Sequence, residues 1–277
     1  MIGRARRYPE PRLPGWMAAL VLAMTILACP GAGIGTARAE DCKLLVASGN
    51  PEYPPYLWRD PKNESQLIGA NAALMGLLSA EIGIPIDVRY IGSWARVQEE
   101  MKSGHIDLIS GAFLTMERLS YMDYIHPTIA TTRSVVITMS DSAVRYRQRP
   151  DLVGHRGVTV INNSFGEDFD QYARKNLSID EVSKLENALR MLVNKRADYL
   201  IYEDAPARAI AAQLGITGLT EAPDSISNED LYLTLSHRSA CNNGALRGRI
   251  AEVMNRFAED KVMDGLIADA IELWQAQ

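Results

Sequence analysis

The sequence contains few cysteines, few aromatic residues and no hydrophobic run long enough to cross a membrane. Of its 277 residues, three are cysteine and 7% are aromatic. The longest uncharged apolar run, 16–28, is shorter than the roughly 20 residues that a membrane-spanning helix needs. There is no CxxC pair, and the four histidines are scattered without metal-ligand spacing. We therefore expect no metal ion, no cofactor and no thiol redox centre.

The N-terminal segment has the features of an export signal. Four arginines within residues 4–12 precede the apolar run, and Ala37-Arg38-Ala39 matches a small-x-small cleavage site. This pattern predicts a secretory signal peptide over residues 1–39. An alternative is lipoprotein processing at Cys29, because Ile26-Leu-Ala-Cys29 roughly resembles a lipobox, although Leu27 and Pro30 match it poorly.

The charge balance argues against a polyanionic partner. The whole chain has a net charge of −5, and residues 1–39 account for five of its arginines and one of its glutamates. The remaining 238 residues therefore carry 24 basic and 33 acidic side chains, without a basic cluster. Such a surface is unsuited to nucleic acid or an anionic membrane. This length suits one large or two modest domains.

The first part of the exported chain alternates between strand and helix patterns. We expect strands at 43–48, 84–90 and 106–110, with helices at 70–82 and 93–103 between them. A β-α-β-α-β order favours an α/β fold with a largely parallel sheet and helices on its faces. Ligands on such sheets bind at the carboxyl ends of the strands.

The segment 104–124 contains a candidate anion site at such a strand end. A short strand is followed by the Gly111 turn, and Thr115 has the position of a helix N-cap. Arg118 follows three residues later, where the helix dipole does not favour a cation. Exposed backbone N–H groups and a guanidinium together can hold a carboxylate. An ordinary surface arginine is the alternative.

This order of strand, Gly111, Thr115, Arg118 and an aromatic-rich segment resembles the extracellular solute-binding proteins of family 3, the polar-amino-acid receptors of bacterial ABC importers. The resemblance implies a two-lobe, type II periplasmic-binding-protein-like α/β fold with two crossing strands. Residues 40–130 and 233–277 would form one lobe, and residues 131–232 the other. Arg118 would hold the carboxylate of a ligand, with Ser110 and Gly111 around it. Phe113 replaces a small hydroxyl residue of the family pattern, which puts the usual specificity in doubt.

The resemblance also assigns roles to other residues. Tyr53 would cover the ligand. Trp94 would form an apolar wall or belong to the core. Ser164 would begin a second anion-facing helix or act only as a plain N-cap. Either Glu203 or Asp204 would pair with a ligand amine. Two ways of aligning this segment with the family pattern differ by one residue and favour different acids.

Outside the signal segment, only Cys42 and Cys241 remain. An even pair in an oxidising compartment favours a disulfide over two separate buried thiols. In the family arrangement, this bond would join the start of the first lobe to its returning segment.

The resemblance implies a monomeric periplasmic receptor, not an enzyme, that delivers a small zwitterionic ligand to an ABC permease in the inner membrane. A solute-sensing or accessory protein without a transport role is one alternative. Another is an enzyme similar to the exported cyclohexadienyl dehydratases, with Glu167 or Glu203 as general acid.

Overall fold

The computed structural model describes residues 42–277, so the expected signal peptide and Cys29 lie outside the described part. Within this part, no helix has both the length and the apolar character needed to cross a membrane. The helices are α1 (Ala70–Ile82), α2 (Trp94–Ser103), α3 (Glu167–Asn176), α4 (Leu185–Val193), α5 (Asp204–Gln213), α6 (Gly244–Glu259) and α7 (Val262–Gln275). The strands are β1 (Leu45–Ser48), β2 (Glu52–Tyr53), β3 (Leu57–Arg59), β4 (Leu67–Ile68), β5 (Ile86–Val88), β6 (Leu108–Ala112), β7 (Met122–Met139), β8 (Arg156–Val160), β9 (Ser178–Val182), β10 (Tyr199–Glu203) and β11 (Leu219–Ser236).

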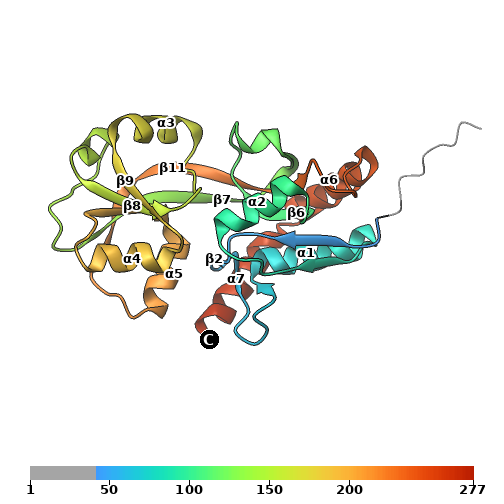
Figure 1. The fold of residues 1–277 in the computed structure, drawn as a ribbon. Coiled ribbons are helices and arrows are strands. Elements are labelled where there is room, and N and C mark those ends of the chain that lie inside the picture. Colours follow the sequence, from blue (N-terminus) through green and yellow to red (C-terminus); the bar gives the residue numbers. More distant parts are fainter. Residues whose placement is uncertain (1–41) are drawn as a thin grey trace, which may run out of the picture. The chain divides into compact units, whose positions relative to one another are not determined.

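Eight strands form one sheet in the order β5-β1-β6-β11-β7-β10-β8-β9. The long strands β7 and β11 pair with each other antiparallel at its centre (Figure 1). On one side of them, β1 pairs parallel with β5 and β6. On the other side, β8 pairs parallel with β9 and β10. The sheet thus consists of two parallel groups joined through two shared strands.

Strands β7 and β11 are each 18 residues long, longer than their sequence patterns predict. The β-branched run in β7 is recognisable, whereas residues 219–230 of β11 include Asp224, Asn228 and Asp230, which are unfavourable in strands. Pairing with β7 supplies the backbone hydrogen bonds that the local sequence does not encourage. Tertiary pairing therefore extends both strands beyond their local signals.

The local sequence patterns predict the positions of helices α1 and α2. Helix α1 has the bounds expected from the sequence, and α2 is capped by Ser93, whose side chain accepts from the N–H of Arg96. The helix expected after Thr115 is wrong. Only a three-residue 3-10 turn, Arg118–Ser120, forms there, because β7 already begins at Met122. The Thr115 hydroxyl nevertheless accepts from the N–H of Arg118 at 3.2 Å.

The C-terminal helices return to the N-terminal part of the chain. Helices α6 and α7 both pack against α1, whereas α4 and α5 pack against strands of the β8–β10 group. The predicted disulfide is present and joins Cys42 to Cys241, 199 residues apart in the sequence. It ties the segment before β1 to the loop before α6.

Candidate functional site

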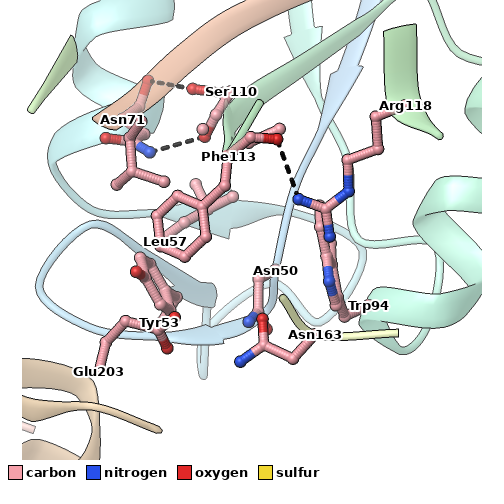
Figure 2. A pocket seen from close by; sticks show the side chains of 13 residues that line it. Asn50, Tyr53, Leu57, Asn71, Trp94, Ser110, Phe113, Arg118, Asn163 and Glu203 are labelled. Atoms are coloured by element: carbon pink, nitrogen blue, oxygen red, sulfur yellow. Dashed lines mark hydrogen bonds between the residues drawn. The ribbon is translucent and has the colours of Figure 1, made fainter. Parts of the chain in front are cut away.

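A small cavity lies where the two groups of strands meet, next to the ends of β1, β6 and β10. Its volume is about 20 Å³, which is enough for roughly one water molecule. Figure 2 shows the side chains around it. The lining residues are Asn50, Tyr53, Leu57, Asn71, Trp94, Ser110, Gly111, Ala112, Phe113, Arg118, Asn163, Glu203 and Leu231.

Arg118 is the one positively charged residue that the described part of the chain places on this lining, and its side chain is fixed by uncharged groups. It is 4% exposed. Its Nε donates to Gln98 Oε1 at 3.3 Å, and its terminal nitrogens donate to the main-chain oxygens of Phe113 and Asn162, both at 3.1 Å. The Arg118 Cζ lies 5.3 Å from the centre of the Trp94 ring, within range of a cation–π interaction. Among residues 42–277, the hydrogen-bond partners of this guanidinium, which has five N–H donors, are all uncharged oxygens.

The main-chain oxygen of Asn162 accepts from three side chains. Besides Arg118, Trp94 Nε1 and Gln98 Nε2 donate to it, each at 3.2 Å. Asn162 has a left-handed backbone, with φ of 59°, and lies in the turn after β8. The carbonyl thus joins that turn to α2 and to the segment that follows β6.

Glu203 lies at the end of β10 and is the one negatively charged residue that the described chain places on the lining. It is 1% exposed, and neither carboxylate oxygen has a hydrogen-bond partner among residues 42–277. Burial raises the pKa of Glu203 from 4.5 to about 7, although the nearby Asn163 amide and the charge of Arg118 partly oppose this. The Tyr53 hydroxyl is also buried without a partner. Burial, followed by the charge of Glu203, raises the pKa of Tyr53 well above its usual value.

A buried carboxylate without partners is energetically unfavourable by several kcal/mol unless it becomes protonated or gains a cation. Arg118 presents positive charge on the same cavity, but within residues 42–277 neither oxygen of Glu203 accepts a hydrogen bond from it. The cavity therefore has one positive and one negative lining group, each able to accept a further partner.

Asp204, the other candidate for the amine, has a different environment. It does not line the cavity. Its Oδ2 lies 3.4 Å from a nitrogen of Arg133 and 3.4 Å from a nitrogen of Arg208, while its Oδ1 accepts from the N–H of Ala205 at 2.7 Å. Its carboxylate already has charged and polar partners.

Ser164 also lies outside this cavity. Its hydroxyl donates to Oδ2 of Asp170, and the N–H of Phe165 donates to Oδ1 of the same carboxylate at 2.9 Å. Burial raises the pKa of Asp170 despite these bonds. Ser164 instead lines a larger cavity of about 390 Å³, which shares Arg118 and Asn163 with the first. The hydroxyl of Ser164 and the N–H of Phe165 thus already donate to a carboxylate of the protein itself.

The structure brings six of the eight candidate ligand-binding residues to one cavity: Tyr53, Trp94, Ser110, Gly111, Arg118 and Glu203. Gly111 has φ of 112°, and a Cβ placed there would lie 2.8 Å from Nδ2 of Asn71. Only glycine fits this turn without displacing the Asn71 side chain.

Asn50, Asn71 and Asn163 line the cavity but were not anticipated from the sequence. The Nδ2 of Asn71 donates to the main-chain oxygen of Ser110 at 2.6 Å, and its Oδ1 has no partner. A signal for Asn71 existed, because it lies three residues before Leu74 on the buried face of α1. The lining residues Leu57 and Leu231 carry no comparable signal.

Comparisons with known proteins identify the family. Residues 45–267 match the model for bacterial extracellular solute-binding proteins, family 3. The chain belongs to this family. No curated protein sequence matches it.

Solved structures similar to this family 3 protein share its fold. They include a P235GK mutant of ArgBP from T. maritima, with 19% identity, a TM-score of 0.69, and coverage of 85% of this chain and 96% of that one. AbpA from Streptococcus pneumoniae bound to L-arginine has 21% identity, a TM-score of 0.70, and coverage of 84% and 96%. A histidine kinase sensor domain with similarity to periplasmic binding proteins has 20% identity, a TM-score of 0.71, and coverage of 82% and 95%. The predicted two-lobe fold and the family are therefore confirmed, and the chain is a solute-binding protein.

Proposed function

We propose that this protein captures a small zwitterionic ligand, an amino acid or a related compound, between its two lobes. The observation that carries the proposal is the placement of Arg118 and Glu203 on one cavity, buried and not paired with each other. The guanidinium would bind the ligand carboxylate, and the Glu203 carboxylate would bind the ligand amine. Both buried charges would then gain a partner.

Glu203 is a better amine partner than Asp204. Its two oxygens have no hydrogen-bond partner, whereas Asp204 is engaged with Arg133 and Arg208. Tyr53 would cover the ligand from the β2 side, with its hydroxyl close to the amine. Ser110 and Gly111 would lie near the carboxylate, and Trp94 would form an apolar wall.

We propose lobe boundaries at residues 40–130 with 233–277, and at 131–232, with β7 and β11 as the hinge. Contacts on opposite sides of the cavity would join the lobes when closed. On one side, Asn50 Nδ2 donates to the Tyr202 hydroxyl and the N–H of Leu185 donates to Glu52, each at 2.9 Å. On the other side, the Asn162 carbonyl accepts the three side-chain hydrogen bonds described above. A cavity of about 20 Å³ does not admit an amino acid, so entry requires these contacts to open.

Isothermal titration calorimetry with amino acids tests the site. Replacing Arg118 with alanine removes the carboxylate partner and should weaken binding by about 100-fold or more, the effect of removing a buried charged partner. Arg96→Ala is the matched control, because Arg96 is exposed and pairs with Glu100 on its own helix. Equal affinities of the Arg118→Ala and Arg96→Ala proteins, both folded by circular dichroism, would exclude this site.

A second pair of variants distinguishes the amine partners. Glu203→Gln should weaken binding strongly, and Asp204→Asn should change it little. The reverse order would assign the amine to Asp204.

We further propose that the protein acts in the periplasm as a monomer and delivers its ligand to an ABC permease in the inner membrane. Family membership supports this role. A sensing role without transport is the second candidate, supported by the likeness to a histidine kinase sensor domain. Uptake of radiolabelled ligand by a strain that lacks the gene for this protein separates the two roles. A transport receptor is required for uptake, and a sensor is not.

A further inference from the structure

The charges around the cavity restrict the ligand that it can take. Within the described residues, 42–277, Arg118 and Glu203 are the only charged residues on its lining. In the proposed function, the carboxylate and the amine of the ligand pair with these two groups. A third charge on the ligand would then be buried opposite uncharged groups, which is strongly unfavourable.

Three carboxylates near the cavity already have other partners. Glu52 accepts from the N–H of Leu185, and Asp170 accepts from Ser164 and Phe165. Asp204 lies near two arginines. Among residues 42–277, a cationic ligand side chain would find no carboxylate on this lining other than Glu203, and an anionic side chain would find no second cation there.

The remaining lining suits a neutral group. Asn71 Oδ1, Asn163 Nδ2 and the Tyr53 hydroxyl are buried, and none has a hydrogen-bond partner in the part of the chain that the structure describes. They offer one acceptor, one donor and one hydroxyl to a small polar group. Leu57 and Leu231 add apolar surface that suits aliphatic carbon.

Phe113 limits the available space. Phe113 lines the cavity together with Leu57, Asn71 and Tyr53 (Figure 2) and is 4% exposed. The main-chain oxygen of Phe113, rather than its ring, accepts from Arg118 and from the Tyr124 hydroxyl. The ring can therefore be removed while the carbonyl that orients Arg118 stays in place.

We propose that the ligand is an amino acid with a small, uncharged side chain and that the ring of Phe113 sets the upper limit of its size. This inference rests on the proposed function. It makes Phe113 the residue that determines specificity, and glycine, alanine, serine and threonine the first candidates.

The test is calorimetric titration of the purified protein, unfolded and refolded to remove bound solutes. The panel contains the four small neutral amino acids, leucine and phenylalanine as large neutral ones, and arginine, lysine, aspartate and glutamate as charged ones. At least one small neutral amino acid should bind about 100-fold more tightly than every charged one, given the cost of an unpaired buried charge. Leucine and phenylalanine should bind more weakly than the small ligands.

Phe113→Ala should improve binding of leucine relative to alanine by about tenfold, by creating space for a larger apolar side chain. Phe113→Leu, a smaller change, should move the ranking in the same direction if the alanine variant does not fold. Phe165→Ala is the matched control, because Phe165 packs against Phe169 away from the cavity. Its ranking should equal that of the unmodified protein.

The outcomes separate the two proposals. Preferred binding of a charged amino acid, lost in Arg118→Ala, would overturn the inference and leave the proposed function standing. Folded protein that binds no member of the panel would overturn both. Unchanged rankings in folded Phe113→Ala or Phe113→Leu protein would overturn the role of Phe113.

Discussion

Arg118 donates a hydrogen bond of 3.1 Å to the main-chain oxygen of Asn162, which belongs to the other proposed lobe. An N–H group of Arg118 that could bind a ligand carboxylate thus binds a neutral carbonyl instead. The donor in this bond is already charged, but a carboxylate is a charged acceptor as well and can accept two parallel N–H bonds from a guanidinium. A carboxylate that replaces this carbonyl, or binds the remaining N–H groups, would therefore gain free energy.

Gln98→Ala should lower the free energy of unfolding by about 1–2 kcal/mol, because buried groups lose their partner. Gln98 is 5% exposed, accepts from Arg118 Nε and donates to the Asn162 oxygen. Urea unfolding followed by circular dichroism measures the change. Gln171→Ala, on the exposed face of α3, is the control and should stay within about 0.5 kcal/mol of the unmodified protein. Similar losses in both variants would contradict a special role for Gln98.

Glu203 should make the protein less stable as the pH rises from about 4.5 to about 7. Its pKa is raised in the folded state, so the folded protein holds a proton that the unfolded chain releases in this range. The stabilisation is therefore complete below the unfolded pKa and is lost as the pH passes the folded pKa, by on the order of 3 kcal/mol. Unfolding by urea across pH 4–8 tests this, and Glu203→Gln should remove that part of the pH dependence. If the unmodified and Glu203→Gln proteins lose stability in parallel across this pH range, the raised pKa of Glu203 is contradicted.

Ligand affinity should have the opposite pH dependence. An ammonium group binds the ionised form of Glu203, so affinity should fall by up to about tenfold per pH unit below the pKa of about 7. Calorimetry in buffers of different ionisation enthalpy should also detect proton release on binding near pH 6. Binding without proton release at this pH would mean that Glu203 is already ionised or does not meet the amine.

Reduction of the Cys42–Cys241 disulfide should destabilise the protein by about 2–5 kcal/mol. The bond links residues that are 199 positions apart, so it strongly restricts the unfolded chain. Urea unfolding with and without dithiothreitol measures the difference. A Cys42→Ser, Cys241→Ser double variant controls for effects of the reductant itself, and its stability should be insensitive to dithiothreitol.

Gly111→Ala should cost about 1–3 kcal/mol of stability and also weaken ligand binding. The backbone there has φ of 112°, and the new Cβ would approach Nδ2 of Asn71 to 2.8 Å. Gly248→Ala is the control, because Gly248 lies within α6 with open space around its Cβ position. This second change should stabilise the helix by up to about 1 kcal/mol. Denaturant unfolding of both variants measures whether the two substitutions change the free energy of unfolding in opposite directions.

Much of the α/β order was predictable because it depends on local patterns. Helix α1 follows from its apolar spacing, and the start of α2 follows from Ser93 as N-cap. The turn after Thr115 shows where local rules failed. Its capping bond forms as expected, but pairing of β7 with β11 begins at Met122 and stops the helix.

The sequence by itself determined the family resemblance, the cysteine pair, and Arg118 as the candidate cation of the site. Only the tertiary structure decided which acid at the end of β10 lines the cavity. Neighbouring residues at a strand end point in different directions, and the orientation follows from the pleat and the start of the next helix. Thus Glu203 is buried at the cavity and Asp204 lies between arginines. The capture of Ser164 by Asp170 likewise depends on packing, because short-range spacing offers the serine several partners and the folded turn selects one.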